Sequence, residues 1–197
     1  MTRPLCSQCQ YPISSCVCRF VQSVNNEINV WILQHPHEAS QAKSTTPLLQ
    51  LALQQAHICV GEVPGDFSQV TALDPLHCAV LYPSQSATPL ETMNIADKSV
   101  IKHIIVLDGT WSKVHRVWQQ NLWLHAIKGI SFANVPRSRY RIRKANRENS
   151  LSTLEATAYC LQQLEQLDTA PLFKLLDGFV EVQTQHMPEH VKSRYEL

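Results

Sequence analysis

Four cysteines near the start of the sequence have the side chains and the spacing of a metal site. Two residues separate Cys6 from Cys9, and a single residue separates Cys16 from Cys18. Four thiolates can enclose a zinc ion in tetrahedral geometry, and ligands need only converge on one ion whatever their spacing along the chain. The pattern therefore predicts a structural zinc site, with an iron–sulfur cluster or labile disulfides as the alternatives.

A carboxylate and an indole follow a short apolar run in the middle of the chain. Residues 103–111 read His-Ile-Ile-Val-Leu-Asp-Gly-Thr-Trp. The run is short for a helix and rich in β-branched residues, which predicts a buried strand that ends at Asp108. Gly109 lets the backbone turn sharply, and Thr110 can cap a helix that begins at Trp111. Open α/β sheets hold their ligands at such strand ends. The alternative is a turn-forming Asp108 with Trp111 in the core.

A basic segment follows later in the chain, and its arginines alternate with other residues. An extended segment would therefore present these arginines on one face. With Tyr140 interleaved, the pattern favours contact with RNA phosphates, while a solvated charged face is the alternative. The six basic residues of this segment are Arg137, Arg139, Arg141, Arg143, Lys144 and Arg147.

Hydroxyl side chains come next, directly before a strong helical pattern at 154–167. Ser150, Ser152 and Thr153 can simply cap that helix. Backbone N–H groups and hydroxyls at a helix N-terminus also form a pocket for a charged ligand group.

Short apolar runs that alternate with helical patterns must position these residues. Strands are predicted at 28–33, 58–60, 78–82, 104–107 and 127–132. The helices between and after them imply a parallel sheet with right-handed crossovers. The chain has five glycines and no dinucleotide-binding or P-loop pattern. The stretch His35-Pro36-His37-Glu38 lacks the spacing of a helical zinc motif and is predicted to be a polar loop.

Composition sets the outer limits of the interpretation. The 197 residues suffice for one domain with a small appendage, divided here into a zinc-binding segment with four cysteines at 1–24 and a catalytic domain at 25–197. No apolar run approaches the roughly 20 residues of a membrane helix, and a secretory signal is not recognisable. Clustered cysteines in an odd total of seven favour a reducing cytoplasm, and Cys59, Cys78 and Cys160 are expected to be buried thiols. The oligomeric state is open, with a monomer slightly favoured.

The net charge of +1 conceals an uneven distribution. Residues 112–147 contain nine Lys or Arg and no acidic residue, whereas residues 148–197 contain eight acidic and three basic residues. A segregated basic segment in a nearly neutral chain predicts a polyanionic partner.

Taken in order, these motifs resemble the DTW-domain family over essentially the whole chain. The resemblance rests on the paired cysteines, Lys43-x-Thr45, Leu81-Tyr82-Pro83, Asp108-Gly109-Thr110-Trp111, the basic segment and Leu151-Ser152-Thr153-Leu154-Glu155-Ala156. One departure is Thr46, which stands where an Asn is expected.

The resemblance implies a fold, a reaction and a site. The fold is an α/β, SPOUT-like parallel sheet flanked by helices, with a knotted C-terminal half that binds S-adenosyl-L-methionine. The reaction is transfer of the 3-amino-3-carboxypropyl group to N3 of a uridine in the tRNA variable loop, which gives acp3U and methylthioadenosine. Asp108 is the candidate base that deprotonates N3, or else it stabilises the sulfonium. A methyltransferase acting on RNA and a non-catalytic RNA-binding module are the alternatives.

By the same resemblance, the residues divide into two sets. The cofactor would lie against Leu81, Tyr82, Pro83, Asp108, Gly109, Thr110, Trp111, Val135, Ser150, Leu151, Ser152 and Thr153. The tRNA would contact the six basic residues of the basic segment together with Lys43 and Lys113.

Overall fold

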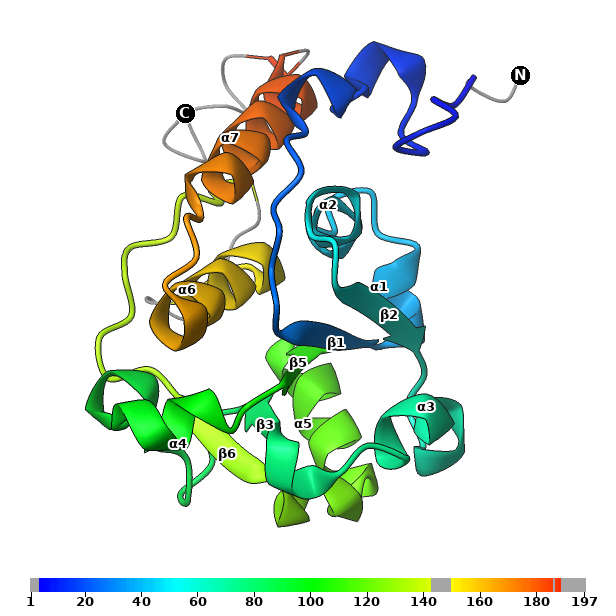
Figure 1. The fold of residues 1–197 in the computed structure, drawn as a ribbon. Helices are drawn as coiled ribbons and strands as arrows, with labels where there is room; N and C mark the ends of the chain where they lie inside the picture. The colour runs from blue at the N-terminus through cyan, green and yellow to red at the C-terminus, as the bar shows by residue number, and fades with distance from the viewer. Residues whose placement is uncertain (1–3, 143–149, 186, 189–197) are drawn as a thin grey trace.

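In the part of the chain that the structure describes, six parallel strands form one sheet in the order β2-β1-β5-β3-β6-β4 (Figure 1). The computed structural model describes residues 4–142, 150–185 and 187–188. The strands are β1 (Asn29–Gln34), β2 (Ala56–Val60), β3 (Cys78–Leu81), β4 (Thr88–Pro89), β5 (His103–Asp108) and β6 (Lys128–Ser131). The predicted parallel α/β sheet is thus confirmed, and each predicted run forms a strand. The short β4 was not predicted, because two residues carry no periodic pattern.

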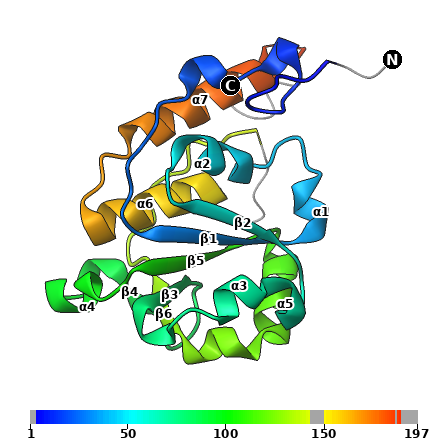
Figure 2. The same ribbon diagram turned by 45° about the vertical axis from the view of Figure 1, so that its right-hand side comes forward.

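Helices cover both faces of the sheet. Figure 2 shows α2, α6 and α7 on one face and α3 and α5 on the other. The α-helices are α1 (Pro36–Ala39), α2 (Thr46–Ala52), α3 (Ser68–Thr71), α4 (Ile95–Ser99), α5 (Trp111–Gln120), α6 (Thr153–Glu165) and α7 (Ala170–Thr184). Shorter 3-10 turns are η1 (Ile13–Ser15), η2 (Cys18–Phe20), η3 (Pro64–Phe67), η4 (Pro75–His77), η5 (Leu90–Thr92) and η6 (Leu122–Ala126).

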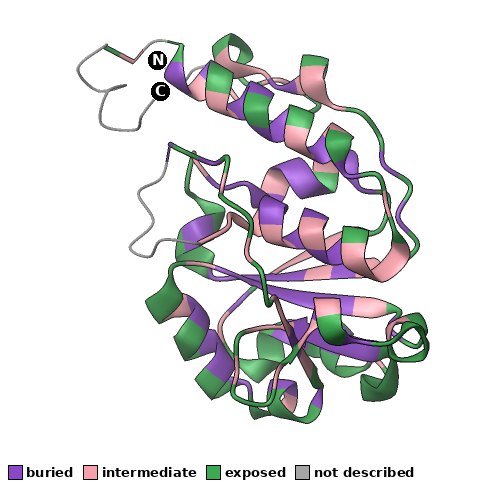
Figure 3. Ribbon diagram, turned by 90° about the vertical axis from the view of Figure 1, so that its left-hand side faces the viewer, coloured by how far each residue is buried: buried purple, intermediate pink, exposed green. Residues whose placement is uncertain are grey.

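The core has two halves, one on each face of the sheet, and β5 contributes to both. Ile104 and Val106 pack in the cluster that includes α2, α6 and α7, whereas Ile105 and Leu107 pack against α5. Figure 3 shows this burial along the strands and on the inward faces of the helices. Successive strand residues point to opposite faces. Asp108, two residues beyond Val106, therefore lies on the same side as α2 and α6.

The chain reverses its winding direction between β1 and β5. From β1 it proceeds to β2 through α2 on one face, and from β5 it proceeds to β6 through α5 on the other face. In open α/β sheets such a switch point opens a crevice at the carboxyl ends of the two strands, where ligands bind. Gln34 and Asp108 are the last residues of β1 and β5 and pair with each other in register.

The predicted polar loop at 35–38 is wrong, because residues Pro36–Ala39 form the one-turn helix α1. The His35 side chain caps this turn by accepting a hydrogen bond from the His37 N–H at 3.2 Å. Pro36, in the first helical position, has its φ preset for the turn. Glu38 is consequently buried instead of exposed.

The cysteine-bearing segment packs along α7 (Figure 1). Cys9 and Val17 are buried in the same hydrophobic cluster as residues of α7. The Phe20 ring approaches α7 so closely that only a glycine fits there, since a Cβ on Gly178 would lie 2.3 Å from the ring. The segment therefore shares its core with the sheet domain.

Two further expectations concern the C-terminal half and membranes. The predicted knot depends on the path through residues 143–149, which lie outside the described residues, and it stays a prediction. Among the described residues, no helix has both the length and the apolar character needed to cross a membrane.

Candidate functional site

The Asp108 carboxylate lies where β1, β5 and α6 meet. It is only 6% exposed. Its Oδ2 accepts a hydrogen bond from Gln34 Nε2 at 2.8 Å, and its Oδ1 accepts one from the Thr153 hydroxyl at the start of α6. Two elements distant in sequence thus hold one carboxylate from both sides, at the edge of the sheet where ligands bind.

Glu155 ties the basic segment to the start of α6. Its carboxylate accepts hydrogen bonds from the Ser152 N–H at 2.8 Å and the Arg139 N–H at 2.6 Å. It also accepts from the hydroxyls of Ser138 and Ser152, at 2.9 and 2.8 Å. Sequence reasoning assigned Glu155 no role, although the Ser-x-x-Glu spacing of a capping box was a readable signal.

The loop at 43–46, before α2, is the other wall of this site. Ser44, Thr45 and Thr46 are all buried. The Ser44 hydroxyl accepts a hydrogen bond from Gln34 Nε2 at 3.3 Å, and the Thr45 hydroxyl accepts one from the Leu154 N–H at 3.3 Å. The Thr46 hydroxyl is buried and has no hydrogen-bond partner among the described residues.

Two tyrosines hold this loop from outside. The Tyr11 hydroxyl, from the cysteine-bearing segment, donates to the Ser44 carbonyl at 3.4 Å. The Tyr140 hydroxyl, from the basic segment, donates to the Lys43 carbonyl. The loop is therefore a junction between the Asp108 site and two segments predicted to contact metal and RNA.

The structure gathers the predicted cofactor residues at the carboxyl edge of the sheet. Leu81 pairs with Val106 at that edge, where Tyr82 and Pro83 follow it, and Val135 lies beyond β6. Ser150 and Leu151 are half-buried beside Ser152 and Thr153.

The three residues after Asp108 differ from the expectations of a left-handed glycine, a capping threonine and a core tryptophan. Trp111 is 40% exposed, which excludes its packing in the core. Gly109 does not adopt a left-handed conformation, but a Cβ there would lie 3.2 Å from the Cβ of Lys113. Thr110 stands at the N-cap of α5 without a side-chain capping bond, and its hydroxyl lies 3.3 Å from that of Ser112.

Tyr82 turns its side chain toward the α5 face of the sheet. Its ring stacks on Trp118 with 4.4 Å between centroids, and its hydroxyl lies 3.2 Å from His115 Nδ1.

His35 supports the same edge of the sheet as a buried side chain. It is 3% exposed, and burial lowers its pKa despite Glu62, whose carboxylate oxygen lies 3.6 Å from Nε2. The His35 N–H donates to the Asp108 carbonyl at 3.0 Å, so this residue braces the end of β5 through its backbone.

The basic segment shows the expected alternation where the structure describes it. Arg137, Arg139 and Arg141 are exposed, whereas Tyr140 and Ile142 are buried. Arg143, Lys144 and Arg147 lie outside the described residues.

Several of the basic residues have partners within the protein. Arg139 forms an ion pair with Asp177 of α7 and lies over the Phe173 ring, 5.4 Å from its centroid. Lys43 Nζ donates to the Ile142 carbonyl at 3.0 Å, and Lys113 Nζ pairs with the buried Glu38 at 2.9 Å. Two clefts, of about 500 and 380 Å³, run along α7 beside Arg139 and do not reach Asp108.

The four N-terminal cysteines converge as a metal site requires. Their sulfur atoms lie within 4.8 Å of one another, with Cys6–Cys18 and Cys9–Cys16 each 3.7 Å apart. Two sulfurs bound tetrahedrally to zinc at about 2.3 Å lie roughly 3.8 Å apart, whereas a disulfide bond measures about 2.05 Å. The spacing thus fits a shared metal ion and not disulfides.

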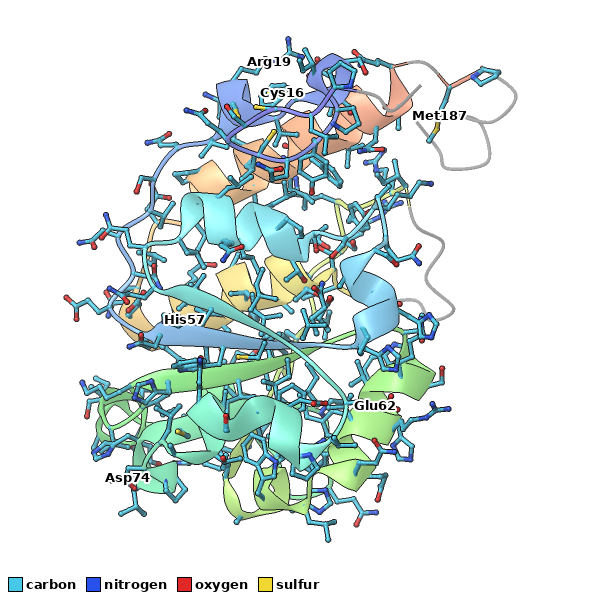
Figure 4. All side chains as sticks on the ribbon, turned by 90° about the vertical axis from the view of Figure 1, so that its right-hand side faces the viewer. Cys16, Arg19, His57, Glu62, Asp74 and Met187 are labelled. Carbon is cyan, nitrogen blue, oxygen red and sulfur yellow. The ribbon has the colours of Figure 1, made fainter. Side chains whose placement is uncertain are left out.

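The thiols of the cluster differ in acidity. Donation from the backbone N–H groups of Cys9 and Gln8 lowers the pKa of the Cys6 thiol to about 6, whereas burial and the neighbouring thiols raise the pKa of Cys18 to about 12. Figure 4 shows Cys16 and Arg19 close together at the end of the molecule that carries this cluster.

Fold and site define a parallel α/β domain with a buried carboxylate at its switch point and an appended cluster of four cysteines. The family model described as DTW domain matches residues 3–184. The chain therefore belongs to the DTW domain family.

Curated relatives agree with this membership. The chain is 29% identical to tRNA-uridine aminocarboxypropyltransferase 2 of Macaca fascicularis, over 93% of this chain and 65% of the relative. It is 30% identical to the Drosophila melanogaster protein of the same name, over 93% of this chain and 80% of the relative. It is 23% identical to tRNA-uridine aminocarboxypropyltransferase A of Arabidopsis thaliana, over 98% and 88%. The chain thus spans about two-thirds of the macaque protein, and no solved structure matches it significantly.

Proposed function

We propose that the chain is a tRNA-uridine aminocarboxypropyltransferase that modifies N3 of a uridine in the tRNA variable loop. Relatives from animals and a plant carry this activity in their names. The single observation that carries the proposal is the buried Asp108 carboxylate, held between Gln34 and Thr153 at the switch point of the sheet.

The residues at this edge suit a cationic co-substrate. S-adenosyl-L-methionine, when bound, supplies the methionine-chain carbon that N3 attacks, and methylthioadenosine leaves as the C–S bond breaks. Asp108 provides a negative charge in a site where little water screens it. Backbone groups after Leu81, Asp108 and Val135, with the hydroxyls before α6, would hold the co-substrate. A SPOUT-like knotted C-terminal half forms part of this proposal.

Asp108 is also the proposed base. The uridine N3–H is a weak acid and must lose its proton before N3 can act as a nucleophile. Each carboxylate oxygen has two lone pairs, and Gln34 and Thr153 occupy one on each oxygen. One lone pair on each oxygen is therefore left to take the proton.

The remaining parts of the proposal concern the metal and the RNA. Zinc would be held by Cys6, Cys9, Cys16 and Cys18 as a structural ion, since four thiolates leave no open position. The segment at 1–24 would be an appendage to a catalytic domain at 25–197. Exposed arginines of the basic segment would contact tRNA phosphates, and reduced cysteines suit a cytoplasmic enzyme.

One incubation tests the proposed function. Purified protein is mixed with S-adenosyl-L-methionine and unmodified tRNA, and the small-molecule product is identified by mass spectrometry. We expect methylthioadenosine together with a modified uridine in digested tRNA. S-adenosylhomocysteine would instead show a methyltransferase, and neither product would show a non-catalytic RNA-binding module.

A further inference from the structure

We propose that Gln34 is a positioning residue, whose side-chain amide fixes the orientation of the Asp108 carboxylate for catalysis. The inference rests on the proposed function, because it concerns the residue assigned there as the base. Neither the sequence motifs nor the comparisons assign Gln34 a role.

The geometry leaves the amide a single useful orientation. Gln34 is 4% exposed, and its Nε2 lies 2.8 Å from Asp108 Oδ2 and 3.3 Å from Ser44 Oγ. A carboxylate can only accept hydrogen bonds, so the amide must turn its NH2 group toward Asp108. That group has two N–H donors, and the two contacts use both of them. Rotation of the amide would break both contacts in a buried site, where lost hydrogen bonds are costly.

Gln34 and Thr153 together define the plane of the carboxylate. One donor holds Oδ2 from β1, and the other holds Oδ1 from the start of α6. With one donor alone, the Asp108 side chain could rotate about the remaining contact. A base must lie within hydrogen-bond reach of the proton that it removes, and a displacement of about 1 Å can cost roughly 10²-fold in rate.

The amide is itself anchored to a fixed part of the structure. Ser44, its second partner, lies in the 43–46 loop, which Tyr11 and Tyr140 hold through the carbonyls of Ser44 and Lys43. Gln34 therefore links the orientation of the Asp108 carboxylate to a loop that other segments hold in place.

Gln34→Met tests this role, because it keeps the length of the side chain and removes its donors. We expect kcat to fall by about 10²-fold, while the affinity for S-adenosyl-L-methionine changes by less than about threefold. The acidic limb of the pH–rate profile should move to higher pH, because the carboxylate loses a donor that favours its charged form. Thr157→Val, in α6, is the matched control, since it also removes a buried hydroxyl without a hydrogen-bond partner among the described residues. Its kcat and pH profile should equal those of the wild type.

A double variant separates positioning from a general loss of structure. If Gln34 acts through Asp108, then Gln34→Met should slow an Asp108→Asn protein much less than it slows the wild type. Equal slowing in both backgrounds would overturn the proposal, as would an unchanged pH profile in Gln34→Met.

A crystal structure of Gln34→Met provides a readout that does not depend on activity. We expect the Asp108 carboxylate to turn away from its wild-type orientation while β1 and β5 stay in register. If the wild-type protein transfers nothing to tRNA, the proposed function fails, and this structure still decides whether Gln34 positions Asp108. An Asp108 side chain in its wild-type orientation would refute the inference.

Discussion

At the scale of single residues, the surroundings of Asp108 argue against a mere turn. A turn-forming aspartate normally accepts hydrogen bonds from the backbone two residues on and faces solvent. Asp108 instead accepts from the side chains of Gln34 and Thr153 and is buried. Burying a carboxylate is costly unless its oxygens are hydrogen-bonded. Gln34 and Thr153, from distant elements, supply these hydrogen bonds to the two oxygens of Asp108.

Replacing Asp108 by Asn removes its charge while it preserves the shape of the side chain. We expect transfer to fall by about 10²- to 10⁴-fold, because an amide cannot accept a proton at neutral pH. Affinity for S-adenosyl-L-methionine, measured by calorimetry, should fall only modestly. Asp97→Asn, on the exposed α4, is the control and should keep full activity. Turnover near the wild-type value in Asp108→Asn would mean that the base lies elsewhere.

The sequence could locate Asp108 but not the residues that hold it. A run of β-branched residues stopping at an aspartate is a local pattern, so the strand and its end were predictable. Gln34 lies 74 positions from Asp108, and the two meet only because β1 and β5 pair in register. Glu155 was readable as a cap, but its hydrogen bond to Arg139 depends on the path of a segment without regular structure.

At the scale of elements, the basic segment is extended and packs against α6 and α7. Tyr140 and Ile142 face inward, and Glu155 accepts the Arg139 N–H. This anchoring fixes which side chains remain outside. Arg139 and Arg141 both project from the anchored part.

The double variant Arg139→Ala/Arg141→Ala should weaken tRNA binding and flatten its salt dependence. Each phosphate contact releases counterions, so losing two lowers the slope of log K against log salt by about 1.4 for single strands. Fluorescence titrations at several salt concentrations measure that slope.

Lys102→Ala/Lys128→Ala is the matched control, because both lysines are exposed at the opposite edge of the sheet. It should leave the slope nearly unchanged. Equal slopes in the wild type and the arginine variant would mean that these arginines do not contact phosphates and that Arg139 serves only in its ion pair with Asp177.

A second element-level contact joins η5 to the chain that leaves β6. The Glu91 carboxylate accepts hydrogen bonds from the N–H groups of Ala133 and Asn134, at 2.9 and 3.3 Å, and from the Tyr159 hydroxyl at 3.0 Å. Burial by itself would raise the pKa of Glu91, but these donors outweigh it and hold the pKa below its ordinary value of 4.5.

This contact predicts a loss of stability in acid. A carboxylate whose pKa is lower in the folded state stabilises the fold above its unfolded pKa and loses that contribution as the pH falls through its folded pKa. We expect Glu91→Gln to lower the free energy of unfolding by about 1–2 kcal/mol at pH 7, with a smaller difference below the ordinary pKa of 4.5. Urea denaturation across this range measures the difference. Glu27→Gln, at an exposed position, serves as control, and a pH-independent difference for Glu91→Gln would contradict the assignment.

At the scale of the whole molecule, the order of the strands could not be predicted from the sequence. Each strand is recognised from a local pattern of residues. Strand order instead depends on which strands each crossover passes over, and here β5 lies between β1 and β3. Buried parallel strands look alike as apolar runs, because both of their faces are covered. The packing of the cysteine-bearing segment against α7 could not be predicted either, since Phe20 and Gly178 lie far apart in the chain.

Because of that shared core, we expect a metal ion bound by the four cysteines to stabilise the whole protein. We expect one zinc per chain by elemental analysis, and a lower Tm after chelation that added zinc restores. The reason is that the ion would join four cysteines whose segment packs Val17 and Tyr11 against α7, so its removal would loosen that packing. Cys16→Ser should lower Tm in the same way and abolish the response to zinc. Cys59→Ser, outside the cluster, is the matched control and should keep both. Iron in the purified protein, or a Tm that chelation leaves unchanged, would contradict a structural zinc site.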